Sequence, residues 1–135
     1  MVANALVDAG FLVALLNRHD THHRWAAAQV AHHQPPWKTC DAALSEAFFL
    51  LGTRGHASLA AMLRRQAVIP AFDLAADLER VLDLMQKYSD IPMSLADACL
   101  VRMSETNPDP VVLTTDTDFR VYRRHSRQIV PSITP

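Results

Sequence analysis

Short apolar runs alternate with longer amphipathic stretches along the chain, and this alternation predicts strands separated by helices. The runs expected to form strands lie at residues 4–8, 37–40, 67–72, 111–115 and 129–133. The stretches expected to form helices lie at residues 10–17, 20–33, 41–51, 56–66, 74–85 and 95–105, with a short helix between the last two strands. Strands that alternate with helices connect by right-handed crossovers into a parallel sheet covered on both faces. The pattern therefore predicts an α/β fold of three α/β/α layers around about five parallel strands.

Residues that favour helix ends or sheet edges refine several of these boundaries. Asp20, Asp41 and Asp73 stand where a side-chain oxygen can cap the first turn of a helix. Gly52 is expected to cap the carboxyl end of the helix that begins at residue 41, so that a separate helix follows it. Pro70 has no backbone N–H to donate, which predicts that the third strand lies at an edge of the sheet.

The composition is typical of a packed globular protein. Half of the 135 residues are hydrophobic and 20% are charged, which predicts a single domain over residues 1–135. The formal net charge of −1 gives the chain as a whole no polycationic attraction to nucleic acid. The apolar stretch 9–16 is too short to span a bilayer and follows no basic segment, so we expect no membrane anchor and a cytoplasmic location. Cys40 and Cys99 lack Cys-x-x-Cys spacing and are expected to be buried free thiols.

Four acidic residues stand in apolar surroundings. Asp8 and Asp116 each end a run expected to be a strand, while Glu46 and Asp97 lie inside apolar helical patterns. Unpaired carboxylates are rare in such places, because desolvating a charge costs several kcal/mol. Ligands of open α/β sheets bind beyond the carboxyl ends of the strands, and all four acids meet there if the first and fourth strands are neighbours. A divalent cation shared by the four carboxylates would then relieve their mutual repulsion.

Each acid also has a structural alternative. Ser94 and Asp97 have the spacing of a capping box, in which the acid serves the first turn of its helix. Asp116 could cap the short helix that follows it, and Glu46 could be an ordinary surface residue. Asp8 is the hardest to explain in this way, because the segment after it needs no acidic cap. The occurrence of all four in this order therefore carries more weight than any one of them.

That order resembles the PIN-domain nucleases and, among them, the VapC-type toxins of bacterial toxin–antitoxin pairs. The resemblance covers essentially the whole chain, and its most specific part is the segment Thr114-Thr115-Asp116-Thr117-Asp118-Phe119. It implies a PIN-like domain whose acidic metal site consists of Asp8, Glu46, Asp97 and Asp116, with Asp118 as an auxiliary acid. Many relatives carry Ser, Thr or Asn two residues after the first Asp, to hydrogen-bond the site, whereas this chain has Gly10 there.

The resemblance implies an endoribonuclease that hydrolyses RNA, pairs with an antitoxin protein and forms a homodimer. Hard oxygen donors without cysteine or clustered imidazole favour Mg²⁺ or Mn²⁺ over zinc. Apolar side chains on the helices 41–51 and 56–66 could form the homodimer face or a groove for the antitoxin. The alternatives are a catalytically silent PIN-like module that binds RNA or protein, and a nuclease directed at DNA.

The segment after Phe119 is basic and contains no acid. Arg120, Arg123 and Arg124 follow the acidic motif closely, and guanidinium groups suit phosphate oxygens. We therefore expect these arginines to contact the RNA backbone. The alternative is a solvated basic segment that offsets the charge of the acidic cluster.

Overall fold

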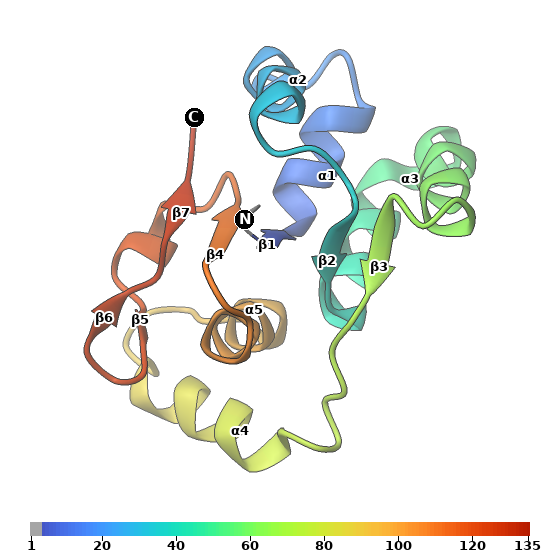
Figure 1. Cartoon of the computed structure of the whole chain (residues 1–135). Helices are drawn as coiled ribbons and strands as arrows, with labels where there is room; N and C mark the ends of the chain where they lie inside the picture. Colours follow the sequence, from blue (N-terminus) through green and yellow to red (C-terminus); the bar gives the residue numbers. More distant parts are fainter. Residues whose placement is uncertain (1–3) are drawn as a thin grey trace.

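A five-stranded parallel sheet forms the centre of the computed structural model, which describes residues 4–135 (Figure 1). The strand order is β3-β2-β1-β4-β7, and every neighbouring pair in it runs parallel. The strands are β1 (Asn4–Val7), β2 (Trp37–Thr39), β3 (Val68–Pro70), β4 (Pro110–Leu113) and β7 (Ser132–Ile133). The expected fold class is confirmed, as are the contact between the first and fourth strands and the edge position of the strand that holds Pro70.

In the described residues, five α-helices and one 3₁₀ helix accompany the sheet. They are α1 (Ala9–Leu16), α2 (His23–His32), α3 (Asp41–Arg64), α4 (Leu78–Lys87), α5 (Leu95–Thr106) and η1 (Thr117–Arg120). No helix in the described part of the chain has both the length and the apolarity needed to cross a membrane. Cys40 and Cys99 are buried free cysteines, as predicted.

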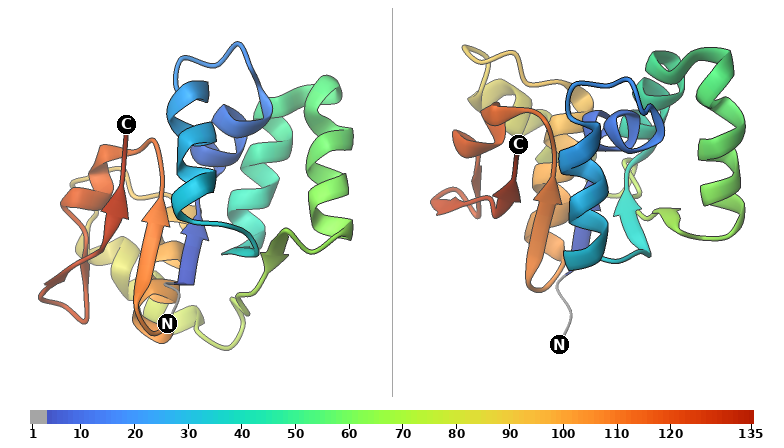
Figure 2. Two further views of the ribbon diagram at one scale, coloured as in Figure 1. Left: turned by 45° about the horizontal axis from the view of Figure 1, so that its top comes forward. Right: turned by 90° about the horizontal axis from the view of Figure 1, so that it is seen from above.

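Side chains alternate between the two faces of the sheet, so each strand contributes to two separate cores. Leu6 of β1 and Val112 of β4 pack against α4 and α5. Val7 of β1 and Leu113 of β4 pack on the opposite face, against α1, α2 and most of α3. Figures 1 and 2 show these two groups of helices on opposite sides of the sheet. The arrangement leaves the carboxyl ends of the strands free to carry a site.

Helix starts differ most from the sequence-based expectation. The Asp20 and Asp73 side chains accept hydrogen bonds from the backbone N–H two residues later, and helices α2 and α4 begin only at His23 and Leu78. These aspartates form local turns, which their short side chains favour as readily as helix caps. Helix α3 is broken at Gly52, where φ is 64° and the backbone leaves helical geometry, so two helical segments meet at a kink and the expected helix end at Gly52 is confirmed.

The last expected strand is split in two. β6 (Gln128–Ile129) pairs antiparallel with β5 (Arg123–Arg124), and only the residues after Pro131 join the central sheet as β7. The hairpin turns through His125 and Ser126, whose φ angles are 49° and 67°. This positive-φ turn matches the twist of a tight hairpin but is usually signalled by Asn or Gly, so the sequence did not indicate it.

Candidate active site

Asp8 stands at the carboxyl end of β1 and caps helix α1. Its Oδ1 accepts a hydrogen bond from the backbone N–H of Ala9 at 2.8 Å, and its Oδ2 accepts one from the hydroxyl of Thr114 at 2.8 Å. Only 7% of the residue is exposed. Both oxygens therefore have neutral donors, and the negative charge of the carboxylate lies almost out of water.

Thr114 links the ends of the two central strands. Its hydroxyl donates to Asp8 and accepts a hydrogen bond from the backbone N–H of Asp116 at 2.9 Å. Asp116 in turn caps η1 by accepting from the N–H of Asp118 at 2.8 Å. One threonine thus holds Asp8 and Asp116 at the same edge of the sheet. Thr114 belongs to the segment that resembles the family motif, yet no sequence pattern assigned it a role beside the acids.

Asp97 occupies the third position of α5 and forms the capping box that its spacing with Ser94 suggested. The Ser94 hydroxyl accepts from the Asp97 N–H at 3.0 Å, and Asp97 Oδ2 accepts from the Ser94 N–H at 3.3 Å. The same Oδ2 also accepts from the hydroxyl of Tyr122 at 3.1 Å. Tyr122 is fully buried, and no sequence pattern had marked it as a partner of the acids.

The remaining acids of the predicted site are more open to solvent. Glu46 lies in the second turn of α3 and is exposed, whereas Asp116 and Asp118 are partly buried. The charge of Glu46 nevertheless contributes to the raised pKa of Asp8. The charges of Asp116 and Asp118 contribute to the raised pKa of the Tyr122 hydroxyl. The structure thus brings all five predicted acids within electrostatic reach of one edge of the sheet.

The pKa values of the two buried acids show how strongly this edge disfavours negative charge. Burial raises the pKa of Asp8 from 3.8 to about 6, helped by the charges of Asp97 and Glu46 and opposed by the two hydrogen bonds. Burial also raises the pKa of Asp97, with a further contribution from Asp116. Desolvation and like charges both favour the protonated acid, and no cation offsets them.

The arrangement fits a hydrated divalent cation in charge and donor chemistry. In residues 4–135, no Lys, Arg or His forms an ion pair with any of the five acids. Over the same residues, no three Asp, Glu, His or Cys side chains form a ready-made metal cage. Mg²⁺ usually keeps several waters and binds through one or two carboxylates, so a closed cage is not required. Carboxylate oxygens without a compensating cation are the donors that suit Mg²⁺ or Mn²⁺.

Gly10 is required by the close approach of Thr115. A Cβ on residue 10 would lie 2.1 Å from the Thr115 hydroxyl oxygen, which is closer than real contacts allow. Thr115 therefore fills the space that a larger residue two positions after Asp8 would occupy. The departure from the family pattern noted at Gly10 therefore coincides with a close contact between Gly10 and the Thr115 side chain.

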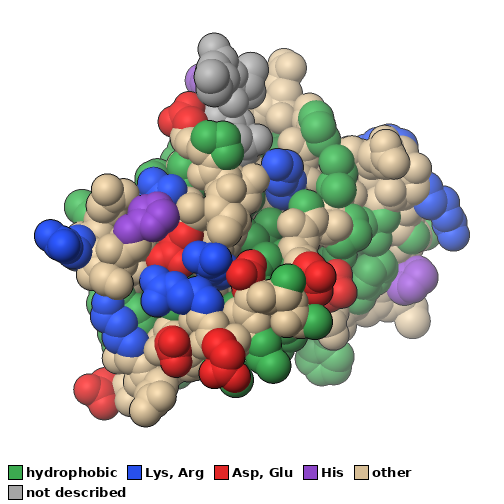
Figure 3. Space-filling model, turned by 60° about the horizontal axis from the view of Figure 1, so that its bottom comes forward, with side chains coloured by type: hydrophobic (Ala, Val, Ile, Leu, Met, Phe, Trp, Pro, Cys, Tyr) green, Lys and Arg blue, Asp and Glu red, His purple; other side chains and the backbone are tan. Residues whose placement is uncertain are grey.

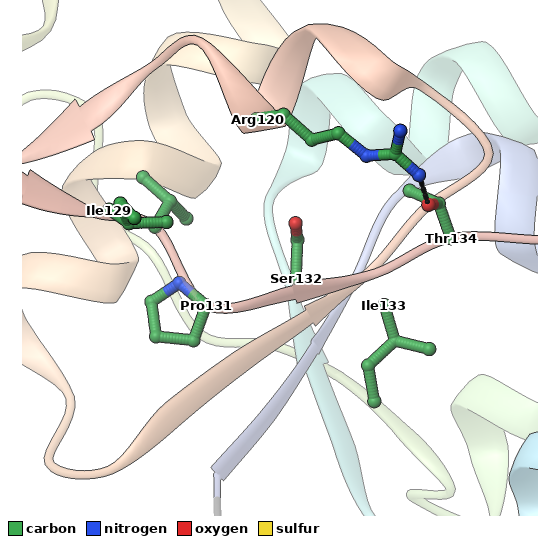
Figure 4. Close-up of a pocket in the computed structure, with 7 residues that line it drawn as sticks. Arg120, Ile129, Pro131, Ser132, Ile133 and Thr134 are labelled. Carbon is green, nitrogen blue, oxygen red and sulfur yellow. Dashed lines mark hydrogen bonds between the residues drawn. The ribbon is translucent and has the colours of Figure 1, made fainter.

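The three arginines expected to contact RNA have different surroundings. Arg120 is exposed and donates to the Thr134 hydroxyl at 2.7 Å across an open hollow of about 640 Å³ (Figure 4). Arg123 donates from Nη1 to the backbone carbonyls of residues 120–122. Arg124 donates to the carbonyl of Ser104. Thr134 follows the carboxyl end of β7, so Arg120 alone of the three reaches toward the edge that carries the acids.

The chain belongs to the PIN domain family, whose model matches residues 5–124. Its fold is similar to the crystal structure of Mycobacterium tuberculosis VapC20, a Sarcin-Ricin loop cleaving toxin, with a TM-score of 0.78. The two sequences are 23% identical, and the match covers 87% of this chain and 94% of VapC20. Identity at this level shows a shared fold. No curated protein matches this chain significantly. The family resemblance read from the sequence is confirmed.

Proposed function

We propose that this chain is a divalent-metal-dependent endoribonuclease and the toxin of a toxin–antitoxin pair. The observation that carries the proposal is the pair of buried carboxylates, Asp8 and Asp97, which repel each other and have no cationic partner in residues 4–135. Such a site is unfavourable in the protein alone and becomes favourable when an external cation is bound. Membership of the PIN domain family and the likeness to VapC20 support RNA as the substrate.

The exposure of the acids suggests which of them would bind the metal ion and which would act on the attacking water. Asp8, Asp97 and Asp116 are held in place by backbone or hydroxyl donors and would bind Mg²⁺ or Mn²⁺ directly or through water. When bound, such an ion lowers the pKa of an attacking water and neutralises charge that develops on the phosphodiester. Glu46 is exposed and forms no hydrogen bond or ion pair with its side chain in residues 4–135, so it can orient that water and accept its proton. Asp118 supports the same edge as an auxiliary acid.

Arg120 would hold the RNA backbone beside the acids. Its guanidinium is exposed, and its partner Thr134 follows the strand whose end lies level with that of β4. A phosphate could replace the Thr134 hydroxyl as its acceptor, in a geometry that guanidinium groups favour. Arg123 and Arg124 already donate to backbone carbonyls, so we expect them to contribute less to RNA binding.

Helix α3 would provide the contact with a second copy or with an antitoxin. Phe49 and Leu50 are 83% and 55% exposed next to the kink at Gly52. With His56 and Ala57 on the following turns, Phe49 lines an open hollow of about 520 Å³. Large apolar side chains gathered in this way usually mark an interaction surface. The homodimer and the antitoxin are both implied by the family resemblance.

The rival function is a catalytically silent module that binds RNA or protein. It is favoured by the fact that Asp8, Asp97 and Asp116 each accept a hydrogen bond from a backbone N–H at the start of a helix. A purely structural role explains those bonds but gives no reason to leave the carboxylates without a cation.

Metal-dependent cleavage of defined RNAs separates the two functions. We expect Mn²⁺ to support cleavage, EDTA to stop it, and Asp8→Asn and Asp97→Asn each to lower the rate at least about 100-fold. A hairpin with the sarcin–ricin loop sequence belongs among the substrates, given the likeness to VapC20. Asp90→Asn changes an exposed acid that is not among the five acids of the proposed site and is the matched control.

Thermal unfolding of the same variants provides a readout that does not depend on the choice of RNA. Mn²⁺ should raise the melting temperature of the wild type and of Asp90→Asn, since a ligand of the folded state stabilises it by mass action. It should leave Asp8→Asn nearly unchanged. Equal stabilisation of all variants, or cleavage that survives both substitutions at the acidic edge, would refute the proposed site.

A further inference from the structure

The two cysteines of the chain lie against each other, although they come from distant segments. Cys40 follows β2 and is the residue just before α3, while Cys99 lies in the second turn of α5. The Cys40 thiol donates to the carbonyl oxygen of Ala96 at 3.9 Å. Both cysteines lie in the same buried cluster, and the interaction between the two thiols raises the pKa of Cys40 and lowers that of Cys99. Two thiols that lie in one buried cluster but come from different segments can be joined by a disulfide if the segments move slightly toward each other.

A cavity makes this thiol pair reachable. Both cysteines line a half-enclosed space of about 290 Å³, together with Phe72 and Leu74. The same space is bordered by the exposed residues Asp41 and Ser45 of α3. A space of this size admits molecules as small as water or hydrogen peroxide. The cysteines are therefore buried, at 1% and 2% exposure, but form part of the wall of a space that a small reagent can enter.

We propose that Cys40 and Cys99 form an oxidation site that closes to a disulfide in the presence of a peroxide. One thiol attacks a peroxide oxygen and becomes a sulfenic acid, and the first water leaves. The second thiol then attacks that sulfur, so that the S–S bond forms, the S–O bond breaks and the second water leaves. In total two thiols lose two protons and two electrons, and one hydrogen peroxide is reduced to two waters.

The position of the pair links this chemistry to the acidic edge. Cys40 immediately precedes the helix that carries Glu46, and Cys99 lies two residues after Asp97. A disulfide holds its sulfurs about 2 Å apart, so closing it draws the starts of α3 and α5 together. Displacements on the order of 1 Å at catalytic groups lower rates by about 100-fold in sensitive cases. We expect oxidation to reduce RNA cleavage about tenfold or more, an effect that rests on the proposed nuclease function.

The oxidation itself is tested on the full chain without any RNA. The protein is treated with hydrogen peroxide, denatured, alkylated with iodoacetamide and analysed by intact mass and peptide mapping. We expect loss of two hydrogens, no alkylation and one linked peptide pair that contains Cys40 and Cys99. Reduction with dithiothreitol should restore two alkylation sites. The oxidised protein should melt about 5–10 °C higher, because the link restrains the unfolded chain.

Cys40→Ala and Cys99→Ala are the matched variants, since alanine fits an apolar cavity and leaves a single thiol. Neither should form the intramolecular link, and the cleavage rate of neither should fall on peroxide treatment as that of the wild type does. If both thiols of the oxidised wild type remain open to alkylation, or if each oxidises alone to a sulfinic acid, the oxidation site is refuted. If the disulfide forms and no form of the protein cleaves RNA, the oxidation site stands and the nuclease proposal fails.

Discussion

Two carboxylates in this fold are largely hidden from water but have opposite surroundings. The side chain of Glu105, at the end of α5, is 1% exposed, and Asp8 is 7% exposed. Glu105 accepts two hydrogen bonds from Arg80, at 3.1 and 2.7 Å, and one from Arg102 at 3.2 Å. Asp8 accepts only from a backbone N–H and a hydroxyl. Figure 3 shows acidic and basic side chains gathered together on the face where α4 and α5 lie.

The pKa values of the two acids record this difference. Burial alone would raise the pKa of Glu105, but the hydrogen bonds and charge of Arg80, with smaller contributions from His125 and Arg102, lower it below its usual 4.5. The pKa of Asp8 is raised to about 6. Where a buried acid serves the fold, arginines neutralise it. Within residues 4–135 the acids at the strand ends lack such partners, and this contrast is the ground for the proposed cation site.

The largest effect on stability is expected at Glu105, the acid that is paired with arginines. Glu105→Gln removes the charge that faces Arg80 and Arg102, and breaking a buried ion pair on one side costs about 3–5 kcal/mol. Both arginines are partly exposed, at 33% and 26%, which lowers the expected loss to about 2–3 kcal/mol. Urea denaturation at pH 7 measures it.

The pH dependence of this loss follows from the lowered pKa of Glu105. A depressed pKa stabilises the fold above the ordinary value of 4.5 and ceases to do so as the pH falls through the folded value below it. The difference between wild type and Glu105→Gln should therefore shrink below about pH 4. Glu79→Gln, at an exposed position of α4, is the matched control and should change stability by less than about 0.5 kcal/mol. If Glu105→Gln is as stable as wild type, the arginines do not stabilise the fold through the charge of Glu105, and the contrast with Asp8 is lost.

The second largest expected effect is a gain in stability, from the substitution of Asp8. In metal-free buffer above pH 7, Asp8→Asn should stabilise the fold by about 1–2 kcal/mol, because it removes a charge that the folded protein disfavours. The full pKa shift, from 3.8 to about 6, corresponds to about 3 kcal/mol, and weaker hydrogen bonds from Thr114 and Ala9 to a neutral amide reduce the gain.

The sign of this effect also changes predictably with pH. A raised carboxyl pKa means that the folded protein binds a proton more readily than the unfolded chain, so this group costs stability above about pH 6 and the cost disappears toward pH 4. The gain from Asp8→Asn should therefore fade as the pH is lowered, in denaturation curves at pH 8, 6 and 4. Saturating Mn²⁺ at pH 8 should reverse the order, so that wild type becomes the more stable protein. Destabilisation by Asp8→Asn in metal-free buffer would show that Asp8 serves the fold just as Glu105 does.

Most of the fold could be predicted from the sequence, because the patterns that mark its strands and helix starts are local. Apolar runs marked the strands of the central sheet, and a buried parallel strand needs little else. Ser94 and Asp97 gave an exact helix start because both members of a capping box lie within four residues. Asp20 and Asp73 failed as helix caps because a lone aspartate stabilises a turn as well as a cap, and tertiary packing decides which forms.

The candidate site could be predicted only in part, because some of its contacts join residues that are far apart in the sequence. Asp8 and Asp116 could be placed at one edge because strand ends converge in a parallel sheet. Thr114 and Tyr122 could not be assigned, because their hydroxyls acquire a role only through contacts with acids far away in the chain. The arginines after Phe119 looked alike in sequence, but Arg124 is occupied by a carbonyl of α5. Charge can be read from a sequence, whereas its compensation depends on the folded arrangement.

The smallest expected effect tests whether neutral donors partly compensate the acids at the strand ends. Tyr122→Phe removes the hydroxyl that donates to Asp97 and should cost about 1 kcal/mol at pH 8. The bond is strongest when Asp97 is charged, so the loss should decrease as the pH falls and Asp97 is protonated. Because the pKa of Asp97 is already raised, this decrease should begin above its usual value of 3.8.

Tyr88→Phe is the matched control for this substitution. Tyr88 packs against Tyr122 with ring centroids 5.1 Å apart, and its hydroxyl accepts from the backbone N–H of Arg123 at 2.9 Å. Its loss should also cost about 1 kcal/mol, but without the same dependence on pH, since this bond joins a hydroxyl to a backbone amide and involves no carboxylate. Parallel pH profiles for the two phenylalanine variants would mean that the Tyr122 hydroxyl does not respond to the charge of Asp97. A loss of stability confined to high pH in Tyr122→Phe alone would show that a neutral hydroxyl stabilises the charge of Asp97, whereas arginines stabilise the charge of Glu105.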